Sequence, residues 1–252
     1  MEPVEPPVRA EPFEATLVSA RNLSRNVREL VFERSDGRPL RFSPGQWVNV
    51  HLATASDAEQ EVKRAYSIAS APRADNRFEL AITRVEGGPM SEALHRLDVG
   101  ATVRAVGPSG LFTRAATDET PALFVATGTG ITPLRSMIAA AADAGVLDRG
   151  TKMVVLFGVR TQADILYRDE FDRLAAQHPN VRFVVTLSKP DAAWTGRVGY
   201  VQTHVRELWD ELAEPTANAY VCGLEKMVKS VRDVLRNEAG VGRRQVHQER
   251  YD

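Results

Sequence analysis

The stretch Ala126-Thr127-Gly128-Thr129-Gly130-Ile131-Thr132-Pro133 stands between the apolar run Ala122-Leu123-Phe124-Val125 and a helical pattern from Leu134 to Ala144. This order predicts a strand, a glycine turn and the start of a helix. The two glycines allow a sharp turn and a close approach of the backbone to a ligand, because neither carries a Cβ atom. The helix start offers unpaired N–H groups and a positive dipole end, which suit a pyrophosphate. Pro133 is compatible with a first helical turn.

Downstream of residues 118–120, strand and helix patterns alternate. The strands are expected at Ala122–Ala126, Met153–Phe157, Arg182–Thr186 and Ala219–Cys222, with a last one at Gln245–Arg250. The helices are expected at Leu134–Ala144, Asp169–Gln177, Val201–Glu211 and Met227–Glu238. Alternation at this spacing predicts a doubly wound parallel sheet covered by helices on both faces. Residues 117–252 are therefore expected to form an α/β nucleotide-binding domain.

Upstream of the glycine turn, short strands rich in β-branched and aromatic residues dominate. They are expected at Glu14–Ser19, Val27–Glu33, Trp47–Leu52, Ala65–Ala69, Arg77–Arg84 and Thr102–Val106. One helix is expected at Ser91–Leu97. Many short strands with little helix predict an antiparallel β-barrel over residues 13–116. Residues 1–12, rich in Pro and Glu, are expected to form a flexible tail.

The composition is that of an ordinary globular protein of 252 residues, 43% apolar and 26% charged. A net charge of −1 gives no indication of nucleic acid as a partner. One cysteine excludes an intramolecular disulfide and an iron–sulfur cluster held by four cysteines of this chain. No segment resembles a signal peptide or a membrane span, and the histidines lack zinc spacing, so we expect a cytoplasmic protein without a metal site.

A second motif, Arg64-Ala65-Tyr66-Ser67, begins a predicted strand. A guanidinium can clamp a pyrophosphate with two parallel hydrogen bonds, and a tyrosine ring can stack on a flat heterocycle. The alternative is an exposed Arg and a half-buried Tyr on an ordinary strand. Gly87-Gly88-Pro89-Met90-Ser91 precedes the short helix and can offer backbone N–H groups and a hydroxyl to phosphate oxygens, or can be a purely structural turn.

Taken in order, these motifs resemble the ferredoxin–NADP reductase family over about residues 13 to 252. The further matches are Leu166 to Phe171, Tyr200 to Thr203, Tyr220 to Met227 and Glu249 to Tyr251. The resemblance implies an FAD-binding barrel joined to a pyridine-nucleotide domain. It also implies that Arg64 and Ser91 hold the FAD pyrophosphate, that Tyr66 stacks on the flavin ring and that Ser67 approaches flavin N5.

The resemblance further implies a catalytic group and a set of cofactor-binding positions. The catalytic residues would be Ser67, Cys222, Glu249 and Tyr251. The cofactor-binding residues would be Arg64, Ala65, Tyr66, Ser67, Gly88, Met90, Ser91, Thr127, Gly128, Gly130, Thr132, Pro133, Arg160, Ser188, Lys189, Tyr200, Gln202, Cys222, Gly223, Met227 and Tyr251.

Two of these residues have competing interpretations. A lone Cys in an apolar strand is usually a buried small hydrophobe, but Cys222 ends a parallel strand, where open α/β sheets bind ligands. We interpret it as a packing and orienting residue, not a covalent catalyst. Tyr251 resembles the aromatic end of the family's Glu-x-Tyr terminus, although Asp252 follows it here, and it is expected to cover the flavin face that nicotinamide reaches. The alternative is a frayed terminus.

The expected coenzyme is NADPH, with NADH as an alternative. No acidic residue in Thr186 to Lys189 is placed to take a ribose 2′-hydroxyl, and a hydroxyl with an ammonium suits a 2′-phosphate. Tyr200 and Gln202 resemble the family stretch that receives adenine and this phosphate. Lys189 stands where that group usually has Arg, and Asp191 could pair with it.

The leading hypothesis is an FAD-dependent oxidoreductase that passes electrons between NADPH and a one-electron carrier such as ferredoxin or flavodoxin. One alternative is an NADH-dependent reductase component of an oxygenase system that feeds a separate iron–sulfur protein. Another is a flavin-binding subunit that relays electrons within a larger complex. An intact nicotinamide site at Gly128 to Pro133 with Cys222 argues against a pure relay.

Overall fold

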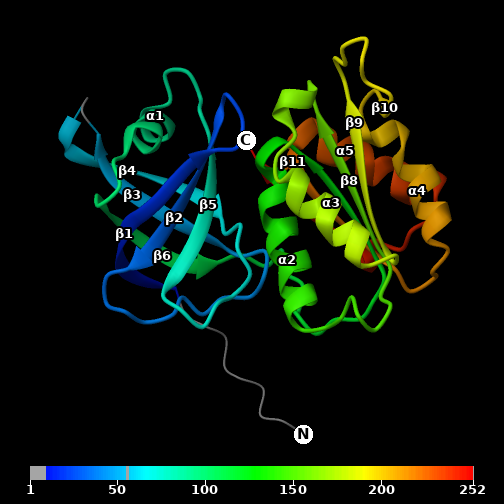
Figure 1. Ribbon diagram of the computed structural model, residues 1–252, viewed down its shortest axis with the longest axis horizontal. Coiled ribbons are helices and arrows are strands. Elements are labelled where there is room, and N and C mark those ends of the chain that lie inside the picture. Colours follow the sequence, from blue (N-terminus) through cyan, green and yellow to red (C-terminus); the bar gives the residue numbers. More distant parts are fainter. Residues whose placement is uncertain (1–9, 55–56, 252) are drawn as a thin grey trace, which may run out of the picture.

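The first half of the chain forms an antiparallel sheet in the computed structural model, which describes residues 10–54 and 57–251 (Figure 1). Its strands are β1 (Glu11–Asn22), β2 (Val27–Arg34), β3 (Trp47–Thr54), β4 (Asp57–Ser67), β5 (Arg77–Thr83) and β6 (Thr102–Ser109). They pair in the order β4-β3-β6-β1-β2-β5. Just beyond β4, Ile68 forms a bridge to Leu80 of β5, so the two outer strands meet and the sheet curls into the expected barrel.

Alternating strand residues fill the barrel. Leu30 and Phe32 of β2 and Phe78 of β5 are fully buried, and the rings of Phe32 and Phe78 stack with centroids 5.7 Å apart. The helix α1 (Pro89–Arg96) packs Met90 and Leu94 into this core. It begins two residues earlier than expected, because proline is well suited to the first helical position.

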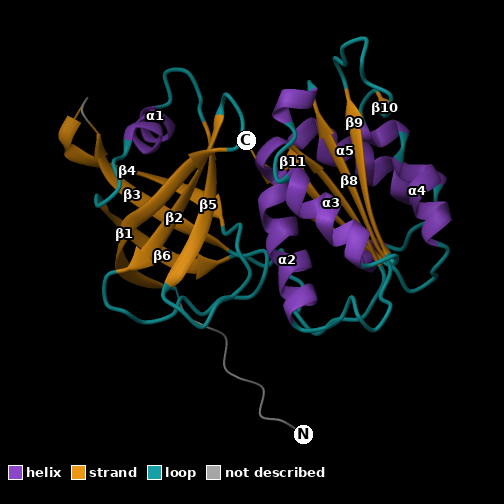
Figure 2. Cartoon of the chain, in the orientation of Figure 1, coloured by secondary structure: helices purple, strands orange, loops and turns teal. Residues whose placement is uncertain are grey.

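The second half forms a parallel sheet with helices on both faces, as expected (Figure 2). The strands are β7 (Ala122–Thr127), β8 (Met153–Val159), β9 (Val181–Leu187), β10 (Arg197–Val198), β11 (Asn218–Leu224) and β12 (Val246–Tyr251), in the order β10-β9-β8-β7-β11-β12. The helices are α2 (Ile131–Asp143), α3 (Arg168–Gln177), α4 (Val205–Leu212) and α5 (Glu225–Asp233). The two sheets lie side by side, and α2 faces the barrel.

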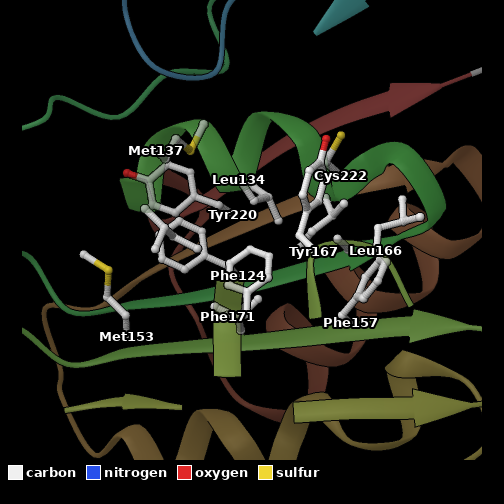
Figure 3. Packing of buried hydrophobic residues seen from close by; sticks show 14 of the residues in the cluster. Phe124, Leu134, Met137, Met153, Phe157, Leu166, Tyr167, Phe171, Tyr220 and Cys222 are labelled. Atoms are coloured by element: carbon white, nitrogen blue, oxygen red, sulfur yellow. The ribbon is translucent and has the colours of Figure 1, made fainter. Parts of the chain in front are cut away.

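Two apolar layers cover the parallel sheet. Phe124 of β7 packs with α2 and α3, whereas its neighbour Val125 packs with α4 and α5. The ring of Phe124 stacks on Tyr220 of β11 at 5.4 Å (Figure 3). Phe112, from the segment that leaves the barrel, meets Tyr220 edge-on at 6.1 Å. The connection between the two halves is thus anchored in the core of the second.

The structure departs from the sequence-based boundaries at several element ends. The segment expected as one helix from Val201 begins as a 3-10 turn, Val201–Thr203, and α4 starts only at Val205, because the Thr203 hydroxyl closes the turn onto the Tyr200 carbonyl. The helix expected at Met227–Glu238 begins at Glu225 and widens to a π-helical turn over Val234–Glu238.

Two further differences concern strands. The sequence did not predict β10, because a strand of two residues is too short to show periodicity. β1 begins at Glu11, inside the predicted tail 1–12, because Glu11 and Pro12 pair with Gly107 and Val106 of β6. Residues 1–9 of that tail lie outside the described residues. No helix in the described ranges is both long and apolar enough to span a membrane.

Candidate active site

A cavity of about 740 Å³ lies where the carboxyl ends of the parallel strands face the barrel. This is the position at which open α/β sheets bind ligands, and the volume is that of a small-molecule site. The barrel contributes Ser24 and Asn26 from the β1–β2 turn, Val27 from the start of β2 and Thr83 from the end of β5. The Thr83 hydroxyl lies 3.1 Å from that of Thr129, so the two halves touch directly beside the cavity.

The two glycines of the turn after β7 have different roles. Gly128 has φ +54°, and a Cβ added there would meet no atom within 4 Å, so the backbone is open toward the cavity. At Gly130 an added Cβ would overlap the carbonyl of Cys222, so this glycine allows the turn to pack on β11. The Thr132 hydroxyl donates to the Thr129 carbonyl at 2.8 Å and holds the helix start. Gly128 therefore leaves room for a ligand, and Gly130 allows the turn to pack closely against β11.

Ser67 and Glu249 meet Tyr251, which lines the cavity. The Ser67 hydroxyl donates to Glu249 Oε1 at 3.2 Å and lies 2.7 Å from the Tyr251 hydroxyl. Ser67 ends β4 of the barrel, whereas the other two residues belong to β12. Cys222 is opposite Glu249 in the β11–β12 register and is fully buried. The structure thus brings together the four residues expected to be catalytic.

The environment shifts the pKa values of this group upward. Burial raises the pKa of Glu249 to about 7, although the Ser67 hydrogen bond opposes the shift. Burial, and then the charge of Glu249, also raise the pKa of the Cys222 thiol. A buried, protonated thiol is a poor nucleophile, which agrees with its interpretation as a packing residue. Glu249 is the member of the group that can exchange a proton near neutral pH.

On the barrel, the flavin-side motif places Arg64 and Ala65 on the exposed surface and leaves Tyr66 half-buried against the core. Burial raises the pKa of Tyr66 to about 12, so its hydroxyl stays neutral. An exposed guanidinium, an aromatic ring and the Ser67 hydroxyl at the end of one strand fit a dinucleotide with a flat ring system. The residues present therefore fit FAD.

At the turn before α1, the Ser91 hydroxyl bonds to the backbone of the turn itself. The Ser91 hydroxyl accepts from the Val85 N–H at 3.1 Å and lies within hydrogen-bonding distance of the Val85 and Gly88 carbonyls. Met90 is buried in the barrel core, so only its backbone can face a cofactor. The side chains of Met90 and Ser91 thus hold the turn. The backbone N–H of Gly87 donates to Glu92 and that of Gly88 to the Val85 carbonyl, so the N–H groups of Met90 and Ser91 remain the candidates for phosphate.

The other expected cofactor residues divide into those that line the cavity and those that support it. The lining residues are Thr127, Gly128, Arg160, Ser188, Tyr200, Gln202, Gly223, Met227 and Tyr251. Among the described residues, Gly130, Thr132, Pro133, Lys189 and Cys222 do not line it. Lys189 is exposed, and its backbone N–H donates to the Arg160 carbonyl. The cationic side chains at the cavity are Arg160 and Lys226.

Sequence reasoning missed several lining residues. Lys226 stands within the matched stretch Tyr220 to Met227, and a cation at the start of a helix after a parallel strand was a usable signal. Ser24, Asn26 and Thr83 carry no such signal, because they reach the cavity only through the docking of the barrel. No cluster of potential metal ligands occurs in the part of the chain that the structure describes.

Comparison with known proteins matches both halves. The oxidoreductase FAD-binding domain family matches residues 14–113, and the oxidoreductase NAD-binding domain family matches residues 124–233. The chain is 54% identical to ferredoxin–NADP reductase B of Sorangium cellulosum over 249 residues, 97% of this chain and 100% of that protein.

More distant similarities extend to reductases of oxygenase systems. The chain is 30% identical to the phenol hydroxylase P5 protein of Acinetobacter pittii, covering 95% of this chain and 65% of that protein. It superposes on the crystal structure of an Amycolatopsis cytochrome P450 reductase with a TM-score of 0.81 at 25% identity, over 96% of this chain and 70% of the other.

The fold and the site define an FAD- and NAD(P)-binding oxidoreductase. The extent of the similarity places the chain more narrowly: it belongs to the ferredoxin–NADP reductase family. The resemblance drawn from the motifs is confirmed.

Proposed function

We propose that this enzyme passes electrons between NADPH and a separate one-electron carrier such as ferredoxin or flavodoxin. The observation that carries the proposal is the meeting of Ser67 with Glu249 and Tyr251, because it joins the flavin-side strand of the barrel to Tyr251, which lines the proposed coenzyme cavity. We place the boundary between the FAD-binding and coenzyme-binding domains at residues 116 and 117, between β6 and β7.

On the barrel, Arg64 would hold the FAD pyrophosphate together with the backbone N–H groups of Met90 and Ser91, and Tyr66 would lie against the flavin ring. When bound, FAD accepts two electrons as hydride and releases them one at a time. The Ser67 hydroxyl donates to Glu249 and can pass a proton between the cavity and that carboxyl, whose pKa near 7 suits exchange at neutral pH. The ring of Tyr251 would exclude water from the same position.

In the cavity, the backbone of Gly128 and the start of α2 would bind the coenzyme pyrophosphate. Tyr200 and Leu224 are 67% and 65% exposed although both are apolar, and both line the cavity, which suits the two faces of an adenine. Arg160 and Ser188 supply a cation and a hydroxyl for a 2′-phosphate, with Lys189 next to them in sequence. This set supports NADPH over NADH.

The carrier is proposed from the relatives. The Sorangium protein is named a ferredoxin–NADP reductase, which favours ferredoxin. The phenol hydroxylase P5 protein keeps open a second function, that of an NADH-dependent reductase component of an oxygenase system. The cationic residues of the cavity argue for NADPH, and so for the first function.

The test is a paired steady-state comparison of NADPH and NADH with ferricyanide, followed by cytochrome c reduction through candidate ferredoxins and flavodoxins. A higher kcat/KM with NADPH, and cytochrome c reduction that depends on an added carrier, are expected. Preference for NADH would favour the oxygenase-reductase function. Failure to reduce ferricyanide with either coenzyme would indicate a relay subunit and refute the proposal.

A further inference from the structure

Arg135 of α2 joins three segments of the chain. Its side chain is 13% exposed. Nη1 donates to the Ala69 carbonyl at 2.9 Å and to Glu79 Oε2 at 2.6 Å, and both of these residues belong to the barrel half. Nε donates to both carboxylate oxygens of Glu170 on α3, at 2.8 and 3.0 Å. One guanidinium therefore holds the barrel against two helices of the other half.

The surroundings of Arg135 are arranged around this contact. The guanidinium lies 4.4 Å from the centre of the Tyr167 ring. Tyr167 is buried with φ +56°, a conformation that a residue other than glycine keeps only where its surroundings hold it. The neighbouring Ser136 is fully buried, and its hydroxyl donates to the Ser70 carbonyl at 2.7 Å. Arg135 and Ser136 thus bind two consecutive barrel residues, Ala69 and Ser70.

The charges make Arg135 hard to replace. Burial opposes its charge, but the hydrogen bond and the charge of Glu170, with that of Glu79, outweigh it and raise the pKa of Arg135 above its ordinary value. Glu79 has one further cationic neighbour, Arg73 at 3.8 Å. Without Arg135, two partly buried carboxylates would face each other between the domains, an arrangement that favours separation of the halves.

The contact lies a few residues beyond the two segments proposed to hold the reactants. Ala69 follows Ser67 by two residues, and Arg135 follows Thr132 by three residues on the same helix start. A strand end and a helix turn are stiff over such short spans, so a shift at Arg135 moves the coenzyme-binding turn relative to the flavin-side strand. Rates of transfer between bound reactants fall steeply with misplacements of about 1 Å.

We propose that Arg135 is a positioning residue for hydride transfer, which sets the orientation of the coenzyme-binding turn against the flavin-side strand through Ala69, Glu79 and Glu170. The proposal rests on the hydride step of the proposed function. It concerns the geometry of the bound reactants and not the affinity for either of them.

The test uses the FAD-loaded enzyme and three variants. Arg135→Met removes the charge at similar length, and Arg135→Lys keeps the charge without the planar fork that reaches all three partners. Ile138→Val, in the core on the same helix, is the matched control for a loss of stability alone. For each, flavin reduction by NADPH is measured in a single anaerobic turnover, together with the Kd for NADP⁺, the nicotinamide–flavin charge-transfer absorbance and the Tm.

We expect Arg135→Met to slow flavin reduction by about tenfold or more, with altered charge-transfer absorbance and a Kd within about threefold of the wild type. Arg135→Lys should reduce its flavin at a rate between those of Arg135→Met and the wild type. Ile138→Val should lower the Tm and keep the wild-type rate. A wild-type rate in Arg135→Met, or equal slowing in Ile138→Val, overturns the proposal. If Arg135→Met does not fold, Glu79→Gln replaces it, and a wild-type rate there has the same meaning.

Failure of the proposed function would look different. A wild-type enzyme that neither NADPH nor NADH reduces would refute the hydride step itself. A wild-type enzyme that is reduced, with an Arg135→Met variant that is reduced equally fast, would refute only the role of Arg135.

Discussion

The hydroxyl of Tyr251 lies 2.7 Å from that of Ser67, although 184 positions separate the two residues in the sequence. The contact depends on the strand order of the second sheet, because Tyr251 ends the strand that pairs with β11, and on the docking of the barrel, because Ser67 ends β4. An aromatic side chain of one domain therefore lies against the end of a strand of the other domain.

Replacing Tyr251 with Ser is expected to strengthen the nicotinamide–flavin charge-transfer absorbance, because the ring no longer competes with nicotinamide. Discrimination against NADH should relax by about tenfold, equivalent to about 1.4 kcal/mol. Tyr251→Phe is the matched control, since it keeps the ring and removes only the hydroxyl, which lies 2.7 Å from that of Ser67. Unchanged spectra and unchanged coenzyme preference in Tyr251→Ser would show that the ring does not cover the flavin.

Arg64→Ala is expected to weaken FAD retention. Loss of a charged hydrogen-bonding partner costs about 1.5–3 kcal/mol, or roughly 10- to 150-fold in the Kd for FAD. Flavin occupancy after dilution and gel filtration measures the effect. Arg38→Ala, which removes an exposed arginine paired with Asp36 in the same domain, should keep its flavin. Full occupancy in both variants would exclude Arg64 from the pyrophosphate site.

Arg160→Ala is expected to raise the KM for NADPH by about tenfold, as expected for loss of a charged contact of about 1.4 kcal/mol. The KM for NADH and both kcat values should change little, because a contact to the 2′-phosphate is remote from the hydride and stabilises ground and transition states equally. Lys189→Ala should show the same pattern with a smaller effect, since Lys189 is not among the described residues that line the cavity. Equal losses with the two coenzymes would show that neither residue recognises the 2′-phosphate.

The two glycines of the turn after β7 should respond differently to alanine. Gly130→Ala forces a methyl group against the Cys222 carbonyl and is expected to destabilise the fold by about 1–3 kcal/mol, seen as a lower Tm. Gly128→Ala places a methyl group into the cavity, so it should raise the Kd for NADP⁺. Because φ at this position is +54°, the substitution should also lower the free energy of unfolding by about 1–2 kcal/mol. Titration of NADP⁺ with both variants distinguishes the two effects, and equal Kd values with equal Tm values would contradict them.

Glu249 should make the stability of the enzyme depend on pH. Its folded pKa of about 7 lies above its ordinary value of 4.5, so ionisation is harder in the folded state. The free energy of unfolding should therefore fall between pH 4.5 and 7 relative to Glu249→Gln, by at most about 3 kcal/mol, and the difference should be constant above that range. Urea unfolding across this range measures it, with the exposed Glu86→Gln as control. Parallel curves for wild type and Glu249→Gln would show that Glu249 is not held in its neutral form.

Local sequence patterns were sufficient to predict the two sheets. Alternation of apolar residues indicated both sheets. The family resemblance implied that Ser67, Cys222, Glu249 and Tyr251 form one group, and the structure brings these four residues together. Domain docking has no local pattern, so the sequence could not indicate that the Ser24 turn lines the cavity or that Arg135 reaches the barrel. Whether Lys189 or Arg160 faces the cavity depends on where two adjacent strands end, and a motif does not specify these ends.

The hydroxyl pair of Thr83 and Thr129 has a consequence for how such enzymes can be recombined. Because this contact lies beside a cavity whose wall includes Ser24 and Asn26 of the barrel, the cavity belongs to neither half alone. In a chimera that joins this barrel to the nucleotide half of a relative, the residues that line the cavity and those at the contact between the two halves would not match. Exchange of one half therefore requires compensating changes in the other, and the two halves are expected to evolve as a matched pair and not as interchangeable modules.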